Sequence, residues 1–318
     1  MRNWLMCLLI LPAALLCPAL RAAAQPEPEK ARVGRLLADG VTAGDKLRAY
    51  DRLHQKLADI HARRGEALAK QGSQEEGKKE LQRANGELLL SRQAYELALQ
   101  RYPDHALLHN YYGEILFDRF DEQEAGVGEW KKAIKLDGKL GRAHNNLGVF
   151  LCHAGGYAEG LASLDKAVLL EPENPDYQYN IAQIYLAHWP QVMEIRKWTA
   201  GDLFKAAMTA SETASRCAPD DFELAADYAR NFFVGEEIGI APDWDRAAKA
   251  WQRVRQLVRN DDEKFNAWLN EGRVWYKANK AGRAVKCCDE ALKVRPQSMV
   301  AEELKNMARE PKRPKSGK

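Results

Sequence analysis

Residues 147–172 read LGVFLCHAGGYAEGLASLDKAVLLEP, and this stretch decides the fold. Small and large residues follow one another in it at fixed offsets, and residues 272–296 repeat the series. A helix needs a small residue where a neighbouring helix crosses closely, and large residues fill the groove beside that crossing. The pattern therefore predicts helices packed in pairs. The two series are Leu147-Gly148, Leu151, Gly160, Leu164, Ala167 and Pro172, then Gly272, Trp275, Ala284, Cys288, Ala291 and Pro296.

The spacing resembles the tetratricopeptide repeat, whose period is about 34 residues. Three less regular copies fill the space between Ala106 and Pro296, and about three stacked copies are enough for a continuous core. The resemblance implies an all-α fold, a right-handed superhelical solenoid of helix-turn-helix units over residues 105–297. The less regular copies are marked by Gly113, Leu116, Ala125, Trp130 and Ala133, by Ala182, Tyr185, Ala207, Ser211 and Ala214, and by Ala229, Phe232, Ala247 or Ala248, Trp251 and Val254.

The segments on either side of the repeats extend the helical prediction. Residues 25–104 hold two long, charged helical patterns parted by Gln71-Gly72, which predict an extended N-terminal hairpin that acts as a degenerate repeat or cap. Residues 298–310 carry capping and dipole-compatible residues and predict a C-terminal capping helix. Residues 311–318 predict a short basic, disordered tail.

The first residues have the pattern of a secretory signal peptide. Arg2 is basic, residues 4–16 are apolar, and Ala22-Ala23-Ala24 offers small residues for cleavage. The apolar run is shorter than the roughly 20 residues that a spanning helix needs. We therefore expect residues 1–24 to be removed on export to the periplasm or envelope, and no transmembrane segment in the mature chain.

Composition and spacing exclude several classes of activity. The 48 Lys and Arg residues nearly balance the 45 Asp and Glu residues, without the basic stripe of a nucleic-acid binder. No nucleotide loop, nucleophile elbow or HExxH motif is present. His109 and His144 share one repeat position, where packing explains them better than metal binding. We expect no catalytic residue, no metal and no cofactor, and we expect Cys152, Cys217, Cys287 and Cys288 to be small, partly buried thiols.

The resemblance also implies a binding surface, because the first helices of such repeats line a concave groove. Aromatic, Asn and Arg side chains there bind an extended peptide by stacking and by hydrogen bonds to its backbone. A solvated groove without a ligand is the alternative. The positions carried over one residue at a time are Asn110, Glu114, Phe117, Arg142, Asn145, Val149, His153, Tyr179, Gln183, Arg230, Phe233, Leu269, Arg273, Tyr276 and Lys277.

Two insertions, near residues 187–201 and 235–245, interrupt the third and fourth copies. They contain Trp189, Trp198 and Trp244, which lie outside the packing pattern. Tryptophan is favoured at interaction hot spots, so these side chains form either a second protein-binding surface or the packing that closes lengthened helices.

The sequence thus predicts a non-catalytic scaffold that binds a peptide or protein partner in its groove. One alternative is an accessory subunit of an envelope assembly or polysaccharide-export machine. Another is an enzyme acting on envelope polymers, for which Glu114 and Asp118 on one helix face are the only suggestion.

Overall fold

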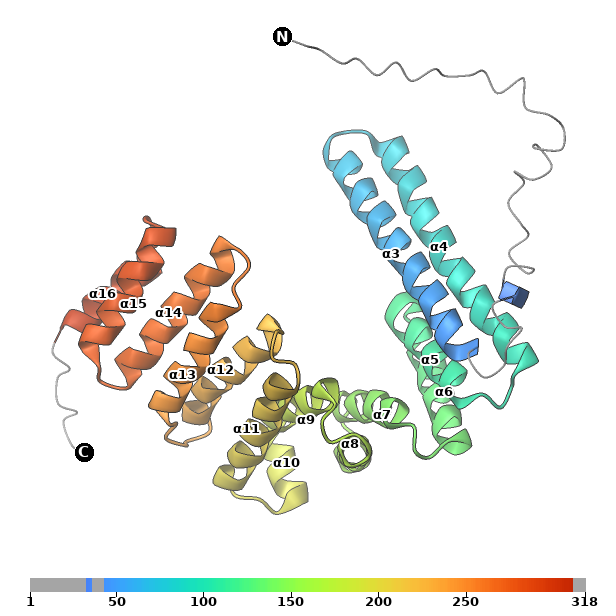
Figure 1. Cartoon of the computed structure of the whole chain (residues 1–318). Helices are drawn as coiled ribbons and strands as arrows, with labels where there is room; N and C mark the ends of the chain where they lie inside the picture. The colour runs from blue at the N-terminus through green and yellow to red at the C-terminus, as the bar shows by residue number, and fades with distance from the viewer. Residues whose placement is uncertain (1–32, 36–42, 311–318) are drawn as a thin grey trace, which may run out of the picture. The chain divides into compact units, whose positions relative to one another are not determined.

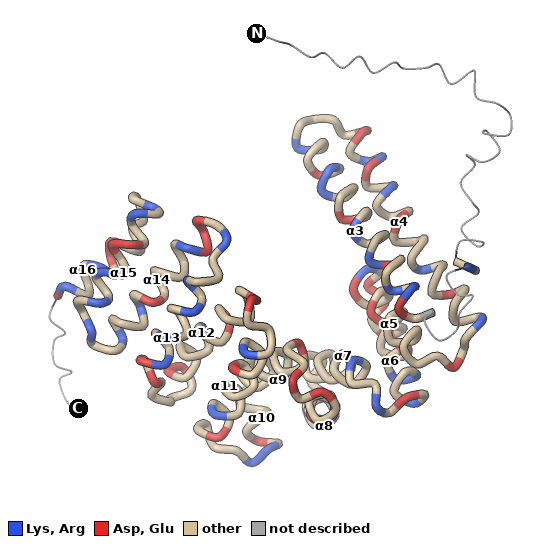
Figure 2. Tube along the Cα trace, in the orientation of Figure 1, with Lys and Arg blue, Asp and Glu red and all other residues tan. Residues whose placement is uncertain are grey.

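The structure is a computed structural model that describes residues 33–35 and 43–310 (Figure 1). The predicted signal peptide and the basic tail lie outside these residues. All regular secondary structure in the described part is helical, as the sequence predicts. None of the described helices is both long enough and apolar enough to cross a membrane. Basic and acidic residues are interspersed along these helices (Figure 2).

The chain divides into two compact units, residues 1–126 and 127–318, which we describe separately. The first unit is built on a long antiparallel hairpin of α3 and α4, drawn in blue and cyan in Figure 1. Its core gathers Leu47, Tyr95, Leu108 and Ile115, all fully or almost fully buried. The bounds are α3 (Ala43–Lys70), α4 (Gln74–Arg101), α5 (Ala106–Phe120) and α6 (Gln123–Leu136), of which α6 continues into the second unit.

The hairpin is held by a close helix crossing near its turn. A Cβ atom added to Gly65 would lie 2.9 Å from the carbonyl oxygen of Gly77, and one added to Gly77 would lie 2.9 Å from the carbonyl oxygen of Gly65. Real Cβ atoms do not approach a carbonyl oxygen so closely, so only glycine fits both positions. The predicted degenerate repeat therefore shares the small-residue crossing of the regular ones.

The second unit stacks helical hairpins and ends in a single helix. The crossing of its first complete hairpin is formed by the quoted stretch, where a Cβ on Gly148 would lie 2.9 Å from the carbonyl oxygen of Gly160. The bounds are α7 (Gly141–His153) with α8 (Tyr157–Leu170), α9 (Pro175–Ala187) with α11 (Ala200–Cys217), α12 (Phe222–Glu237) with α13 (Trp244–Gln256), α14 (Asp261–Lys277) with α15 (Ala281–Val294), and α16 (Met299–Arg309).

The residues of the packing pattern form the core of this unit. Leu164, Ala167, Trp275, Cys288 and Ala291 are all buried. α16 covers the last hairpin, because its buried Ala301 and Leu304 pack against Phe265, Leu269 and Cys288. The pattern read from the sequence is therefore a packing pattern in three dimensions.

One assignment within the pattern is wrong. Ala125 is exposed, and the buried small residue opposite Gly113 is Gly126, whose added Cβ would lie 2.8 Å from the Gly113 carbonyl oxygen. The reason is that α5 runs on to Phe120 before it ends, so its partner position falls one residue later than in the regular copies.

Candidate functional site

The first helices of neighbouring hairpins in the second unit are joined by polar side chains. Asn180 of α9 donates to the Asn145 side chain of α7 over 3.0 Å, and Gln183 of α9 donates to Asp227 of α12 over 2.9 Å. Lys277 of α14 contacts Glu236 of α12 at 2.5 Å. These contacts lie at or beside the predicted groove positions. We call the surface that carries those positions on α7, α9, α12 and α14 the first-helix face.

Asp227 is the buried centre of this network. Its Oδ2 atom accepts from Gln183, from Asn231 Nδ2 at 3.1 Å and from Ser211 Oγ at 3.4 Å. Burial raises the pKa of the Asp227 carboxyl, while Arg230 and the hydrogen bonds act in the opposite direction. The arrangement positions Arg230, whose Nη2 atom lies 3.7 Å from the other Asp227 oxygen and whose side chain remains 52% exposed.

A cavity of about 410 Å³ opens between α12 and α14 beside Arg230. Arg259 pairs with Glu263 at 2.8 Å, and Arg295 pairs with Asp262, so basic side chains compensate two of the lining acids. Arg230 and the amides of Asn266 and Asn270 supply hydrogen-bond donors, which suit backbone carbonyls or a carboxylate. The lining residues are Phe222, Glu223, Ala226, Arg230, Trp251, Asn260, Asp262, Glu263, Asn266, Ala267 and Asn270.

Comparison with known proteins agrees with this architecture. Residues 242–298 match the family model described as a tetratricopeptide repeat. The solved structure of YrrB, described as a TPR protein with an unusual peptide-binding site, is similar over 68% of this chain and 99% of its own, with 19% identity and a TM-score of 0.51. The C-terminal part of a TPR repeat-containing protein from Cytophaga hutchinsonii is similar over 86% of this chain and 98% of its own, with 13% identity and a TM-score of 0.51.

This is a tetratricopeptide-repeat (TPR) fold. The family resemblance predicted from the sequence is therefore supported by a family match over part of the chain and by the three-dimensional structure. A search of curated proteins finds no significant match. The fold places the groove positions on the first helices of the TPR hairpins, but the surroundings of each position differ.

Several predicted groove residues of the second unit are wholly or partly accessible. Arg273 is exposed and donates to Asn270 Oδ1 over 3.0 Å, at the edge of the α12–α14 cavity. Tyr179 is half-buried, and burial near Asp227 raises the pKa of its hydroxyl. Tyr276 borders a smaller cavity of about 260 Å³ that α16 helps to form. Of the others, Arg142, Val149 and Phe233 are half-buried and His153 is exposed.

Leu269, Asn110 and Asn145 do not offer their side chains to a ligand, and these three groove assignments are corrected. Leu269 is 5% exposed, because α15 and α16 enclose it with Phe265, Cys288 and Leu304. Asn110 is 0% exposed and donates to Glu114 over 2.8 Å. Asn145 is 6% exposed and accepts from Asn180. All three residues stabilise the TPR packing.

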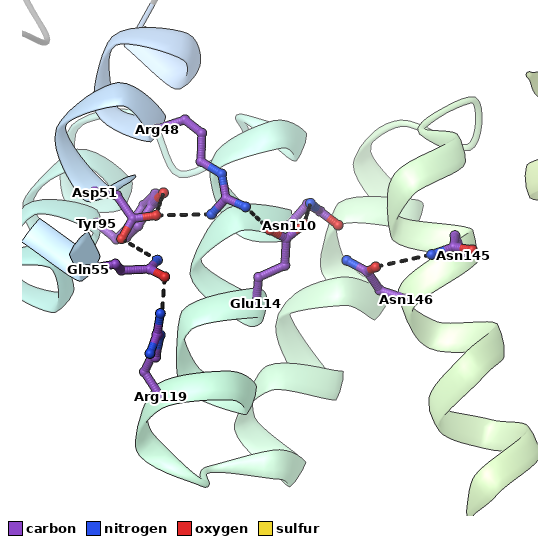
Figure 3. Close-up of polar contacts among 9 residues, drawn as sticks. All are labelled: Arg48, Asp51, Gln55, Tyr95, Asn110, Glu114, Arg119, Asn145 and Asn146. Atoms are coloured by element: carbon purple, nitrogen blue, oxygen red, sulfur yellow. Dashed lines mark hydrogen bonds and ion pairs between the residues drawn. The ribbon is translucent and has the colours of Figure 1, made fainter. Parts of the chain in front are cut away.

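In the first unit, side chains of α3 contact predicted groove residues and their neighbours on α5. Glu114 Oε2 accepts from Arg48 Nη2 of α3 at 2.5 Å, and Arg48 Nη1 donates to the fully buried Asp51 over 3.0 Å (Figure 3). Tyr95 donates to the same Asp51 carboxylate over 3.1 Å. The neighbouring Arg119 donates to Gln55 and Asp59 of α3 over 3.2 and 2.9 Å. The partly buried Phe117 is the remaining predicted groove position on α5.

Two of the three inserted tryptophans pack inward. Trp198 lies edge-on to Tyr185 at 5.4 Å between ring centroids, and Trp244 lies against Phe233 at 5.7 Å. Trp189 is 38% exposed at the start of α10 (Trp189–Arg196), a short helix that the first insertion adds between α9 and α11. The insertions thus close lengthened hairpins, in which Trp198 and Trp244 are half-buried and only Trp189 of the three is exposed.

The sequence missed an apolar cavity of about 650 Å³ beside Trp198. It lies among α8, α9 and α11, and the large apolar side chain of Leu169, which is 74% exposed, marks its position on the surface. The repeat pattern does not encode this cavity, because the inserted segment supplies part of its wall. The lining residues are Asp165, Val168, Leu169, Gln178, Ile181, Tyr185, Trp198, Asp202, Lys205, Ala206, Thr209 and Ala210.

The histidines assigned to packing have a local structural role. His109 contacts the Pro103 carbonyl oxygen at 2.6 Å, and His144 contacts the Gly138 carbonyl oxygen at 3.1 Å. Gln178 donates to the Pro172 carbonyl oxygen over 2.7 Å at the same repeat position. Each side chain thus ties a first helix to the turn that precedes it.

The cysteines are free thiols in the described part of the chain. Cys152, Cys287 and Cys288 are buried, and burial raises the pKa of Cys152 to about 11 and that of Cys287 to about 12. Thiols with raised pKa values are poor nucleophiles at neutral pH. The described residues contain no group of three or more His, Cys, Asp or Glu side chains that could together hold a metal ion.

Proposed function

We propose that this TPR protein is a non-catalytic scaffold that binds an extended segment of a partner protein on the first-helix face of its second unit. The TPR fold itself suggests a protein-binding role. The observation that carries the proposal is the cavity between α12 and α14, where Arg230, Asn266 and Asn270 supply donors from two neighbouring first helices. Such donors recognise the carbonyl groups of an extended backbone without fixing one side-chain sequence.

Arg230 also favours an acidic partner segment. Its guanidinium is held by Asp227 yet half exposed, so one edge remains able to meet a carboxylate. Arg273 lies on the same first-helix face and extends this preference along α14. The description of YrrB as a TPR protein with a peptide-binding site supports peptide binding by this fold.

The proposed setting is the periplasm or the cell envelope, on the strength of the signal-like residues 1–24. An accessory role in an envelope assembly or polysaccharide-export machine is the alternative function, because TPR folds serve many assemblies. N-terminal sequencing of the protein recovered from cells tests export. Cleavage near Ala24 supports it, and a chain that retains Met1 contradicts it.

Affinity purification from an envelope extract tests the binding surface. The full chain is compared with an Arg230→Glu and Arg273→Glu double variant, and with a matched control of Lys131→Glu and Arg216→Glu. The control changes the same net charge on exposed positions of the second helices α6 and α11.

We expect specific recovery of a partner by the wild type and the control, and its loss in the groove variant with little change in melting temperature. A single recovered client supports the scaffold function, and an intact multi-subunit assembly supports the alternative. If the groove variant captures the partner as well as the wild type while Trp189→Ala or Trp198→Ala abolishes capture, binding belongs to the insertion and its apolar cavity.

A further inference from the structure

Two histidines from neighbouring TPR hairpins meet at the ends of their helices. His153 is the last residue of α7, and His188 is the residue that ends α9. The Nδ1 atom of His153 lies 3.2 Å from the Nε2 atom of His188, and the ring planes are inclined by 64°. His153 is exposed and His188 is half-buried, so solvent reaches the pair. Neither residue belongs to the repeat packing pattern.

The separation of the two nitrogens suits one metal ion bound by both. Imidazole nitrogens lie about 2.0–2.1 Å from a bound transition metal, so two of them at a tetrahedral or right-angled spacing are about 2.9–3.4 Å apart. The observed 3.2 Å falls inside this interval. Small rotations of the two rings would therefore aim both lone pairs at one ion without moving either helix.

The helix end beside His153 and the contact of His188 with Tyr157 suit a bound cation. His153 lies at the C-terminal end of α7, where the helix dipole is negative, whereas His188 both ends α9 and precedes α10 as its N-cap residue. The hydroxyl of Tyr157 lies 3.5 Å from Nδ1 of His188, the ring nitrogen that faces away from His153. A partner on the far nitrogen is the usual way in which a ligating histidine is oriented.

We propose that His153 and His188 form a binding site for a divalent transition-metal ion, with His153 Nδ1 and His188 Nε2 as ligands and water in the remaining positions. In the metal-free pair, the N–H group of one ring donates a hydrogen bond to the unprotonated nitrogen of the other ring. On binding, that proton moves to the far nitrogen of its own ring, so both rings stay neutral and no proton is lost. Affinity follows the usual order for nitrogen ligands, with Cu²⁺ bound more tightly than Zn²⁺.

The site has only two protein ligands, so it leaves coordination positions open on the ion. His153 is also one of the predicted groove positions, which places these open positions at the first-helix face. A bound ion thus offers a further anchoring point for a donor group of a partner. The metal site itself does not depend on the proposed peptide binding, because its residues are separate from the α12–α14 cavity.

Titration of the full, untagged chain with Cu²⁺ tests the proposal. Calorimetry measures the binding, and electron paramagnetic resonance identifies the ligand atoms. We expect saturable binding of one equivalent, a spectrum with nitrogen ligands, and weaker binding of Zn²⁺. His153→Ala and His188→Ala should each lose this binding. The matched control is His144→Ala, which removes another histidine of α7 that contacts the Gly138 carbonyl oxygen instead.

Circular dichroism shows whether each variant is folded, so that loss of metal binding is not confused with unfolding. Because His153 is exposed, its substitution by alanine should disturb the fold less than that of His188. Absence of saturable binding to the wild type overturns the proposal. So does binding that persists in the folded His153→Ala variant, or binding that disappears in His144→Ala. None of these results bears on the α12–α14 cavity, which is tested separately by the Arg230 and Arg273 variant.

Discussion

The same repeat positions have different surroundings in the two units. In the first unit Glu114 accepts from Arg48 of α3 and from Asn110, and Asn110 is fully buried. In the second unit Arg230 borders an open cavity and is half exposed. A repeat position therefore fixes where a side chain lies on its helix, whereas the neighbouring helix decides whether that side chain is available to a partner.

The largest effect is expected where both units obey the same rule, at the glycine crossings. Gly148→Leu and Gly65→Leu should each lower the free energy of unfolding by about 4 kcal/mol or more, because even a Cβ would press on a backbone carbonyl. Chemical denaturation measures both. Gly282→Leu is the control, since an added Cβ there meets no atom within 4 Å. A tolerated Gly65→Leu would separate the hairpin from the regular repeats.

The two units should differ most clearly at Arg48 and Arg230. Arg48→Ala should destabilise the first unit by about 3 kcal/mol, because it leaves the buried Asp51 and Glu114 without their cation. Arg230→Ala should cost about 1 kcal/mol or less, because its side chain is half exposed and Asp227 keeps three other donors.

Hydrogen exchange resolved by peptide reads these changes separately in α4 and in α12. Equal effects of Arg48→Ala and Arg230→Ala would contradict the contrast between groove positions that are bound by α3 in the first unit and groove positions that border an open cavity in the second unit.

Acidification should have a smaller effect, and it should change the stability of the two units in opposite directions. The hydrogen bond with His61 lowers the pKa of Glu80, so its contribution to the first unit is present above the usual pKa of 4.5 and is lost as the pH falls below it. Burial raises the pKa of Asp227, so its contribution to the second unit is lost as the pH rises above its usual 3.8.

Hydrogen exchange of α4 and α12 between pH 3 and 7 measures the two trends. Glu80→Gln should flatten the pH dependence of the first unit, and Asp227→Asn should flatten that of the second. If Asp227→Asn steepens the dependence instead, the balance at this carboxyl is set by its hydrogen bonds and not by burial.

The smallest effect is expected at glycines that have no packing role. Gly86 of α4 and Gly128 of α6 lie inside helices, and an added Cβ meets nothing within 4 Å at either position. Alanine at either position should raise the free energy of unfolding by about 0.5–1 kcal/mol, through helix propensity alone. Thermal melting detects it. The same substitution at Gly77 should destabilise, because its Cβ would meet the Gly65 carbonyl oxygen.

The repeat architecture could be predicted from the spacing of small and large residues along the chain. Gly148, Gly160, Leu164 and Ala167 predict a helical hairpin because close crossings and groove filling are local packing demands, repeated at a fixed period. The same reasoning identified the degenerate hairpin and the closing helix. It erred at Ala125, because α5 extends two residues further past its small residue than α7 does, which shifts the partner position, and the period alone does not record this.

Only the tertiary structure decided which surface remains open. The sequence around Asn110 does not show that Arg48, more than 60 residues earlier, pairs with Glu114 one turn along the same helix. The sequence around Leu269 likewise does not show that α16 buries this side chain. The meeting of His153 with His188 also depends on α7 and α9, which are separated along the chain by α8, and the apolar cavity beside Trp198 depends on α9 and α11, which are separated by the first insertion. Secondary structure follows from short-range spacing, whereas the availability of a side chain depends on what distant segments bring against it.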